Sequence, residues 1–238
     1  MASRIPSLRP SPIAFAHRGA RAHTAENTLE AFRLALRLGA TGLESDVWLT
    51  GDGVAVLDHD GIVGSRLRRR SIADVARADL PPHIPTLAEL YAECGSDFEL
   101  SLDVKDPAAL DATVAAARAA GAADRLWLCH HDWNRVASWR EAQPEVRLVD
   151  STRLRAMRDG PERRAAQLAD ARIDAVNLHA SDWTGGLTTL FHRFGITCFG
   201  WDAQLERVLD KLLAAGIDGV YSDHVDRMVD AVTRAPRS

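Results

Sequence analysis

The sequence is poor in cysteine. It holds only three, and Cys94, Cys129 and Cys198 are far apart and odd in number. This spacing argues against a disulfide framework and against a paired-cysteine metal site. We therefore expect a reducing compartment and interpret the protein as cytoplasmic.

Long apolar runs are also missing. No segment approaches the ~20 residues that a membrane-spanning helix needs, and the first 12 residues lack the apolar core of a signal peptide. We expect no integral membrane segment and no signal peptide. The 238 residues fit one large domain or two small ones. We assign residues 1–12 to an N-terminal tail and 13–238 to a single domain.

Positive charge is not in excess. The 29 Lys and Arg against 33 Asp and Glu give a net charge of −4, which argues against a nucleic-acid partner. One basic run, at 66–70, has no aromatic residue within it. We interpret it as a solvated loop.

Short apolar segments alternate with amphipathic ones from end to end. Predicted strands cover 13–16, 42–49, 98–104, 126–129, 146–149, 175–178, 197–201 and 219–221. Predicted helices cover 28–38, 86–94, 108–120, 133–142, 162–171, 187–194, 205–215 and 226–233. This alternation predicts an α/β fold, a (β/α)8 TIM barrel, with an open doubly wound sheet as the alternative.

Local signals mark helix ends. Thr86 and Glu89 have the spacing of a capping box. Gly39, Gly121 and Gly216 each follow a predicted helix and precede a strand, where glycine ends the helix in the left-handed conformation.

One segment interrupts the alternation. A glycine-containing turn at 51–53 joins the second strand to the run 54–59, which predicts a hairpin that extends the strand above the barrel rim. This hairpin places His59 over the mouth of the barrel. From there to Pro85 we expect an irregular excursion that covers part of the site.

Side chains with catalytic chemistry end the first predicted strands. His17 and Arg18 follow the first strand, and Glu44 and Asp46 lie two apart on the second, so both point to one face. Active sites of βα barrels form at this edge. Histidine suits proton transfer, and the arginine fork suits a phosphate. We expect Gly19 to let the backbone approach a ligand closely.

Two like charges on one face are costly unless a cation lies between them. The third predicted strand adds Asp103, with Lys105 two residues on. Three carboxylates from two strands favour a hard cation, Mg²⁺ or Ca²⁺. Zinc is disfavoured because the ligand spacings of zinc sites are missing. A salt bridge to Arg or Lys is the alternative.

The other histidines and the tryptophans receive less weight. His130, His131 and His179 end predicted strands, so they could face the site. We interpret the remaining four as surface residues: His23, His83, His192 and His224. Trp201 ends the seventh strand, where it either walls the pocket or packs in the core.

The ordered set of motifs resembles the glycerophosphodiester phosphodiesterase family over nearly the whole chain. The matching pieces are His17-Arg18-Gly19, Glu26-Asn27-Thr28, Glu44-Ser45-Asp46-Val47, Thr50-Gly51-Asp52-Gly53-Val54, His59-Asp60, Ile84-Pro85-Thr86-Leu87, Leu102-Asp103-Val104-Lys105, Trp201, and Gly216-Ile217-Asp218-Gly219-Val220 with Asp223.

This resemblance implies a TIM barrel that hydrolyses glycerol-3-phospho-alcohols to glycerol 3-phosphate and an alcohol, with a divalent cation. By the family pattern, His17 and His59 form the acid–base pair. The family's metal ligands fall on Glu44, Asp46 and Asp103, and its phosphate contacts on Arg18 and Lys105.

The chain departs from the family at several positions. The family has Glu at Asp103 and Pro at Ala25. It has Ser-Phe-Asp at 130–132 and Trp-Thr-Val-Asn at 201–204. Because Asp is one methylene shorter than Glu, we expect either a water between Asp103 and the metal or a cation drawn toward this strand. The metal preference and the alcohol moiety stay open.

Three rival functions follow from the same residues. A lysophospholipase D or sphingomyelinase-D-like enzyme would have an apolar rim around Trp48, Trp183 or Trp201. A metallo-amidohydrolase would have His-x-His at the first strand, where this chain has Arg18-Gly19. A ligand-binding barrel without catalysis would not need the intact histidines and carboxylates.

Overall fold

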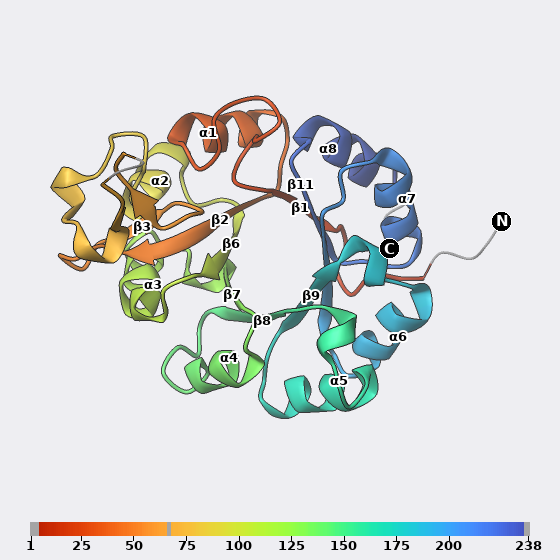
Figure 1. The fold of residues 1–238 in the computed structure, drawn as a ribbon. Coiled ribbons are helices and arrows are strands. Elements are labelled where there is room, and N and C mark those ends of the chain that lie inside the picture. The colour runs from red at the N-terminus through yellow and green to blue at the C-terminus, as the bar shows by residue number, and fades with distance from the viewer. Residues whose placement is uncertain (1–4, 66–67, 236–238) are drawn as a thin grey trace.

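Eight parallel strands form a closed barrel in the computed structural model, which describes residues 5–65 and 68–235. Strand β1 pairs with both β2 and β11, and these two contacts close the ring (Figure 1). The predicted TIM barrel is therefore confirmed, and the open doubly wound sheet is wrong. The strands are β1 (Ile13–Ala16), β2 (Gly42–Leu49), β6 (Glu99–Val104), β7 (Leu126–His130), β8 (Arg147–Ser151), β9 (Ala175–His179), β10 (Thr197–Trp201) and β11 (Gly219–Ser222).

Helices surround the barrel as an outer ring, and each predicted helix is present with its ends shifted by a few residues (Figure 1). The capping box at Thr86 and Glu89 forms both of its hydrogen bonds. None of the described helices is both long and apolar enough to cross a membrane. The helices are α1 (Leu29–Arg37), α2 (Leu87–Cys94), α3 (Leu110–Ala119), α4 (Trp133–Trp139), α5 (Pro161–Asp170), α6 (Gly185–Arg193), α7 (Glu206–Ala214) and α8 (Val225–Arg234).

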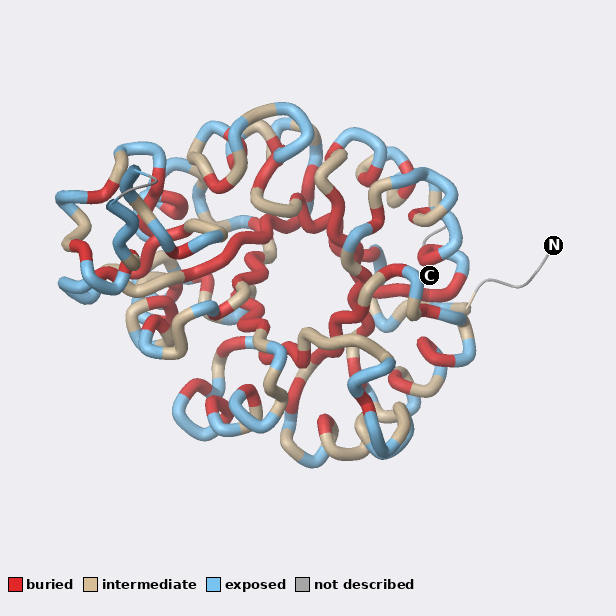
Figure 2. Tube along the Cα trace, viewed as in Figure 1, coloured by how far each residue is buried: buried red, intermediate tan, exposed pale blue. Residues whose placement is uncertain are grey.

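The barrel interior is filled by aromatic side chains, and Figure 2 shows the buried ring of strands around it. Phe15 stacks on Tyr221 with ring centroids 4.6 Å apart, and Trp127 meets Phe199 edge-on at 4.9 Å. This cluster closes the interior, and Tyr221 also lines the pocket above it. The aromatic cluster therefore forms the floor of the site.

The predicted hairpin is confirmed. Strand β3 (Ala55–Leu57) pairs antiparallel with β2, with Val47 opposite Leu57. The excursion that follows has its own apolar cluster, which includes Ile72 and Val75, and it lies beside the barrel in Figure 1. It contains the short strands β4 (Ile62–Val63) and β5 (Arg70–Ser71). Of the basic run, 68–70 is exposed as expected, whereas 66–67 lies outside the described residues.

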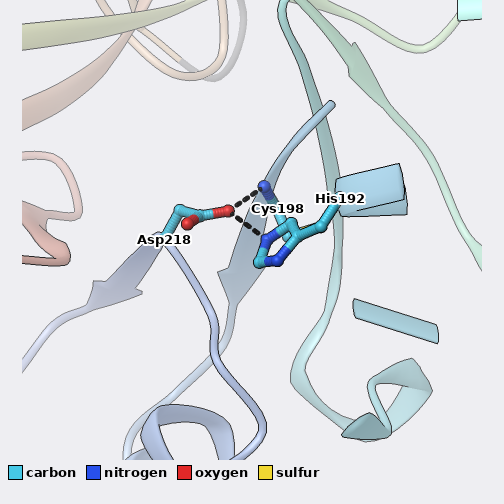
Figure 3. Close-up of side chains that lie close together, drawn as sticks. All are labelled: His192, Cys198 and Asp218. Atoms are coloured by element: carbon cyan, nitrogen blue, oxygen red, sulfur yellow. Dashed lines mark hydrogen bonds and ion pairs between the residues drawn. The ribbon is translucent and has the colours of Figure 1, made fainter. Parts of the chain in front are cut away.

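A buried carboxylate holds the bottom of the barrel together. Asp218 is fully buried in front of β11. Its Oδ2 accepts from His192 Nε2 at 2.8 Å and from the Cys198 backbone N–H at 2.7 Å (Figure 3). Its Oδ1 accepts from the Ser7 hydroxyl and from the Leu8 N–H, both at 2.6 Å. Asp218 thus ties residues 7–8 and helix α6 to the sheet.

The interpretation of His192 as a surface residue is wrong. Its side chain is only 10% exposed, because the last turn of α6 turns it inward onto Asp218. The position near a helix end suggested exposure, but the buried carboxylate that receives this imidazole lies 26 residues further along the chain.

We predict that Asp218→Asn lowers the free energy of unfolding by about 2–4 kcal/mol, because the amide turns a donor toward groups that are themselves donors. Urea denaturation measures this change. Asp124→Asn, at an exposed carboxylate, serves as control and should change the stability by less than about 0.5 kcal/mol. Equal stability of the two variants would contradict the clamp.

Candidate active site

A pocket of about 680 Å³ opens at the carboxyl ends of the barrel strands. It gathers residues that the sequence placed on separate segments. Seven of the eight predicted site residues line it: His17, Arg18, Glu44, His59, Asp103, Lys105 and Trp201. The eighth, Asp46, is buried and bound to Lys105.

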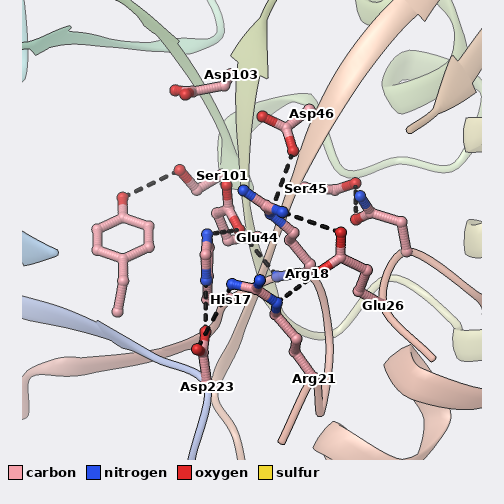
Figure 4. Close-up of polar contacts among 12 residues, drawn as sticks. His17, Arg18, Arg21, Glu26, Glu44, Ser45, Asp46, Ser101, Asp103 and Asp223 are labelled. Carbon is pink, nitrogen blue, oxygen red and sulfur yellow. Dashed lines mark hydrogen bonds and ion pairs between the residues drawn. The ribbon is translucent and has the colours of Figure 1, made fainter. Parts of the chain in front are cut away.

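His17 lies between two carboxylates, as Figure 4 shows. Its Nδ1 is 2.6 Å from Asp223 Oδ1, and its Nε2 is 3.8 Å from Glu44 Oε2. Burial disfavours the imidazolium, but the Glu44 charge and the Asp223 hydrogen bond outweigh it and raise the pKa of His17. The bond to Asp223 fixes the ring so that Nε2 faces Glu44.

Asp223 is itself held in place. The guanidinium of Arg21 lies 3.6 Å from its second oxygen, and its backbone N–H donates to Gln204 Oε1 at 2.9 Å. Burial alone would raise the pKa of Asp223, but the bond to His17 and the charge of Arg21 lower it. Asp223 therefore stays ionised beside the imidazole. Sequence analysis included Asp223 among the motifs that resemble the family but assigned it no role.

Arg18 has an unusual backbone. Its φ of +51° is in the left-handed region, which is costly for a residue other than glycine. In this conformation its N–H donates to Glu44 Oε2 at 2.9 Å, and its guanidinium bonds Glu26 at 2.9 Å. Its Nε is 3.7 Å from Asp46 Oδ2 (Figure 4). Arg18 thus contacts both carboxylates of β2, one through each part of the residue.

The expected role of Gly19 requires a correction. Its φ is +78°, and a Cβ at this position would lie 2.7 Å from the Cβ of Ala31. The close approach is to helix α1, whereas the residue that lines the pocket is Arg18. Glycine is therefore required here for packing of the β1–α1 turn.

The two carboxylates of β2, Glu44 and Asp46, have raised pKa values because they are buried close to other negative charges. Burial raises the pKa of Glu44 to about 7, a shift that His17 opposes and that Asp46 and Asp103 reinforce. Burial likewise raises the pKa of Asp46, against the opposing charge of Lys105.

Lys105 joins two of the three predicted metal ligands. Its Nζ is 3.0 Å from Asp46 Oδ1 and 3.2 Å from Asp103 Oδ2. Burial disfavours the ammonium, but these two carboxylates outweigh it and raise the pKa of Lys105. The salt bridge that sequence analysis kept as an alternative is therefore present at Asp46 and Asp103.

The same three residues still suit a hard cation. Asp46 Oδ2 is buried and has no hydrogen-bond partner among the described residues, since Arg18 Nε approaches it only to 3.7 Å. A buried carboxylate oxygen without a donor is costly. With Glu44 and Asp103 it offers only oxygen ligands, the type that Mg²⁺ and Ca²⁺ prefer. This set of oxygen ligands fits such an ion, although the ligand oxygens of the three residues do not all lie within 4.8 Å of one another.

A second cluster has the composition of a metal site but not its chemistry. Among the described residues, only His192, Cys198 and Asp218 place three potential ligand atoms within 4.8 Å of one another (Figure 3). Burial raises the pKa of the Cys198 thiol well above its usual range, which disfavours the thiolate that binds metals. Asp218 already accepts four hydrogen bonds. We assign this cluster to the structural clamp.

His59 lines the pocket from the loop after β3, with 40% of its side chain exposed. Its Nδ1 is 2.8 Å from Asp60 Oδ1. No other described residue of the excursion to Pro85 lines the pocket. The expectation that the excursion covers the site is wrong, because its residues pack on their own apolar cluster.

Of the histidines and tryptophans that sequence analysis gave less weight, some line the pocket and others do not. His131 and Trp201 line the pocket, whereas His130 and His179 do not. Trp183 is fully buried, with its Nε1 bonded to the Phe199 carbonyl, and Trp48 packs within the excursion. The apolar rim that a long-chain lipid substrate would need is therefore not formed by these tryptophans. Sequence analysis missed Arg155 and Asn177, which also line the pocket.

Comparison with known proteins agrees with this geometry. The model of the glycerophosphoryl diester phosphodiesterase family matches residues 17–227. The chain belongs to this family. It is thus an enzyme, a phosphodiesterase.

Individual relatives extend the likeness over the full barrel. A glycerophosphodiester phosphodiesterase of Caldanaerobacter subterraneus is 22% identical over 93% of this chain and 98% of its own length. The Thermotoga maritima enzyme structure has a TM-score of 0.79 and 25% identity, with 92% of this chain and 97% of that chain covered. A phosphodiesterase of Oleispira antarctica, solved with sn-glycerol-3-phosphate, has a TM-score of 0.80 and 22% identity, covering 94% and 97%.

We predict that Asp223→Asn lowers kcat by about 10- to 100-fold and changes KM by less than about threefold, because the amide no longer fixes one tautomer of His17. Steady-state kinetics on glycerophosphodiesters measure both constants. The matched control is Asp226→Asn, which alters an exposed His–Asp pair with His23. If Asp223→Asn keeps full kcat, Asp223 does not position His17.

Proposed function

We propose that the chain hydrolyses glycerophosphodiesters to glycerol 3-phosphate and an alcohol, with Mg²⁺ or Ca²⁺ as cofactor. The observation that carries this proposal is the meeting of two histidines, three carboxylates and two cations around one pocket. The sn-glycerol-3-phosphate bound to the Oleispira antarctica phosphodiesterase supports the identity of the product. Cytoplasmic location stays a prediction.

Arg18 and Lys105 would bind the phosphate. Both line the pocket, and each already contacts a carboxylate, so their positions are fixed before substrate arrives. A phosphodiester carries one negative charge, and its transition state gathers more. Positioned cations stabilise that charge where it develops.

Glu44, Asp46 and Asp103 would hold the divalent cation. When bound, such an ion polarises the phosphoryl oxygens and adds positive charge opposite the developing negative charge. The Oδ2 of Asp46, which lacks a hydrogen-bond donor among the described residues, and the raised pKa of Glu44 both support a cation at this point.

His17 and His59 would move the two protons that the reaction requires. One removes a proton from the nucleophile, and the other protonates the leaving alkoxide, whose expulsion as an anion is slow at neutral pH. Both imidazoles line the pocket. The Nδ1 of His17 is hydrogen-bonded to Asp223, and the Nδ1 of His59 is hydrogen-bonded to Asp60. Water and the neighbouring glycerol hydroxyl require the same two transfers, so either nucleophile suits this pair.

We predict that His17→Ala and His59→Ala each lower kcat by about 10²–10⁴, because each removes one proton-transfer group. The assay follows the release of glycerol 3-phosphate by purified, folded protein. His83→Ala, at an exposed histidine outside the pocket, is the control and should keep full activity. Near-normal turnover by either pocket variant would overturn the pairing.

We also predict that EDTA abolishes activity and that Mg²⁺ or Ca²⁺ restores it. Asp103→Ala should weaken the apparent metal affinity about tenfold or more, because it removes an oxygen ligand. Asp103→Glu should retain or strengthen the affinity, since the longer side chain reaches further toward the ion.

Metal titration of activity and elemental analysis measure both effects. Asp97→Ala, at a carboxylate outside the pocket, serves as control. If Asp103→Ala leaves the metal dependence unchanged, Asp103 is not a ligand. Activity that survives chelation in metal-free protein would exclude the cofactor altogether.

A further inference from the structure

The wall of the pocket opposite the carboxylates is built from a basic loop. The 3-10 turn Leu154–Ala156 follows β8 and brings Arg153 and Arg155 to the pocket. The carboxylate of Asp182 pins this loop. It accepts from Arg153 Nε at 2.8 Å and from the Leu154 N–H at 3.1 Å. The loop is therefore fixed before any ligand binds.

The two arginines differ in their charge balance. Arg153 is neutralised by Asp182 through two of its nitrogens. Arg155 forms no ion pair with any carboxylate of the described residues, although its side chain lines the pocket. The other acidic residue on this side, Asp202, is turned to His179, with 3.1 Å between its Oδ2 and Nε2. Arg155 thus leaves an uncompensated positive charge at the rim.

Hydroxyl and amide groups lie beside this charge. Ser151 and Thr152 line the wall at the end of β8, and Asn177 lines it from β9. Asn177 is only 6% exposed, and its Oδ1 is buried without a hydrogen-bond partner among the described residues. An acceptor at this depth suits a substrate hydroxyl. A guanidinium at the rim suits an anion.

We propose that the Arg155 rim binds a second anionic group, a carboxylate or a phosphate, on the alcohol half of the substrate. The inference rests on the proposed function. The glycerol half carries no charge besides the reacting phosphate, so only the alcohol half can supply this group. The pocket is continuous from Lys105 to Arg155, and its volume is in the range that holds a small ligand whole.

The same wall disfavours a cationic alcohol such as choline. Quaternary ammonium groups are recognised by open aromatic faces. Trp201 is the tryptophan that lines this pocket, and the Arg153 guanidinium already lies 5.5 Å from its ring centroid. His179 meets the same ring edge-on at 4.5 Å.

Matched substrates test this inference. Glycerophosphoserine and glycerophosphoethanolamine differ by one carboxylate, and glycerophosphoinositol 4-phosphate and glycerophosphoinositol differ by one phosphate. We expect the anionic member of at least one pair to have an about fivefold higher kcat/KM at low ionic strength, with the preference weakening in high salt. The two pairs separate a carboxylate ligand from a phosphate ligand.

Variants at Arg155 assign the effect. Arg155→Ala should bring the ratio within each favoured pair close to one, and Arg155→Lys should restore part of it. Arg158→Ala, at an exposed arginine of the same segment outside this pocket, should keep the ratio. The inference is overturned if neither pair shows a preference, or if Arg155→Ala leaves the preference intact.

Binding separates this inference from the proposed function. Calorimetric titration of both substrate pairs into the His17→Ala protein, with Mg²⁺ or Ca²⁺ present, measures their affinity for the Arg155 rim without turnover. Absence of hydrolysis for every substrate would overturn the proposed function alone. Equal affinities within both pairs would overturn the anionic rim.

Discussion

Crowding of negative charge at one end of the barrel is the constraint on which the site depends. Glu44, Asp46, Asp103 and Asp223 meet around a single mouth, and burial makes the charges of Glu44 and Asp46 expensive. Neighbouring cations offset part of this cost. Lys105 joins Asp46 to Asp103, Arg18 contacts both carboxylates of β2, and His17 and Arg21 hold Asp223. The residues that neutralise the carboxylates are those suited to a phosphate and to proton transfer.

The two ends of the barrel differ in how completely their buried polar groups are hydrogen-bonded, and this difference distinguishes the structural end from the functional end. At the bottom, Asp218 accepts four hydrogen bonds, and nothing is left for a ligand. At the top, and within residues 5–65 and 68–235, Asp46 and Asn177 each keep a buried oxygen without a hydrogen-bond partner, and Arg155 forms no ion pair. Unsatisfied groups of this kind are costly in a folded protein. Their grouping around one pocket marks where substrate and cofactor would complete the structure.

Much of the fold follows from local sequence signals. The alternation of strands and helices, the capping box at Thr86 and the β2–β3 hairpin are all local, and the structure confirms each. Barrel geometry then brings strand ends together, which is why Glu44, His59 and Asp103 meet in one pocket as expected.

Features that depend on tertiary contacts were beyond the sequence. Asp223 reaches His17 only because β11 pairs with β1, about 200 residues apart. The inward turn of His192 and the close contact of Gly19 with Ala31 likewise depend on neighbours distant in the chain.

The central claim is that the carboxylates of β2 and β6 bind the cation. Anomalous diffraction from crystals soaked in Mn²⁺ tests it most directly. The account predicts a peak within coordination distance of Glu44, Asp46 and Asp103, whereas a peak at His192, Cys198 and Asp218, or none at saturating Mn²⁺, would contradict it.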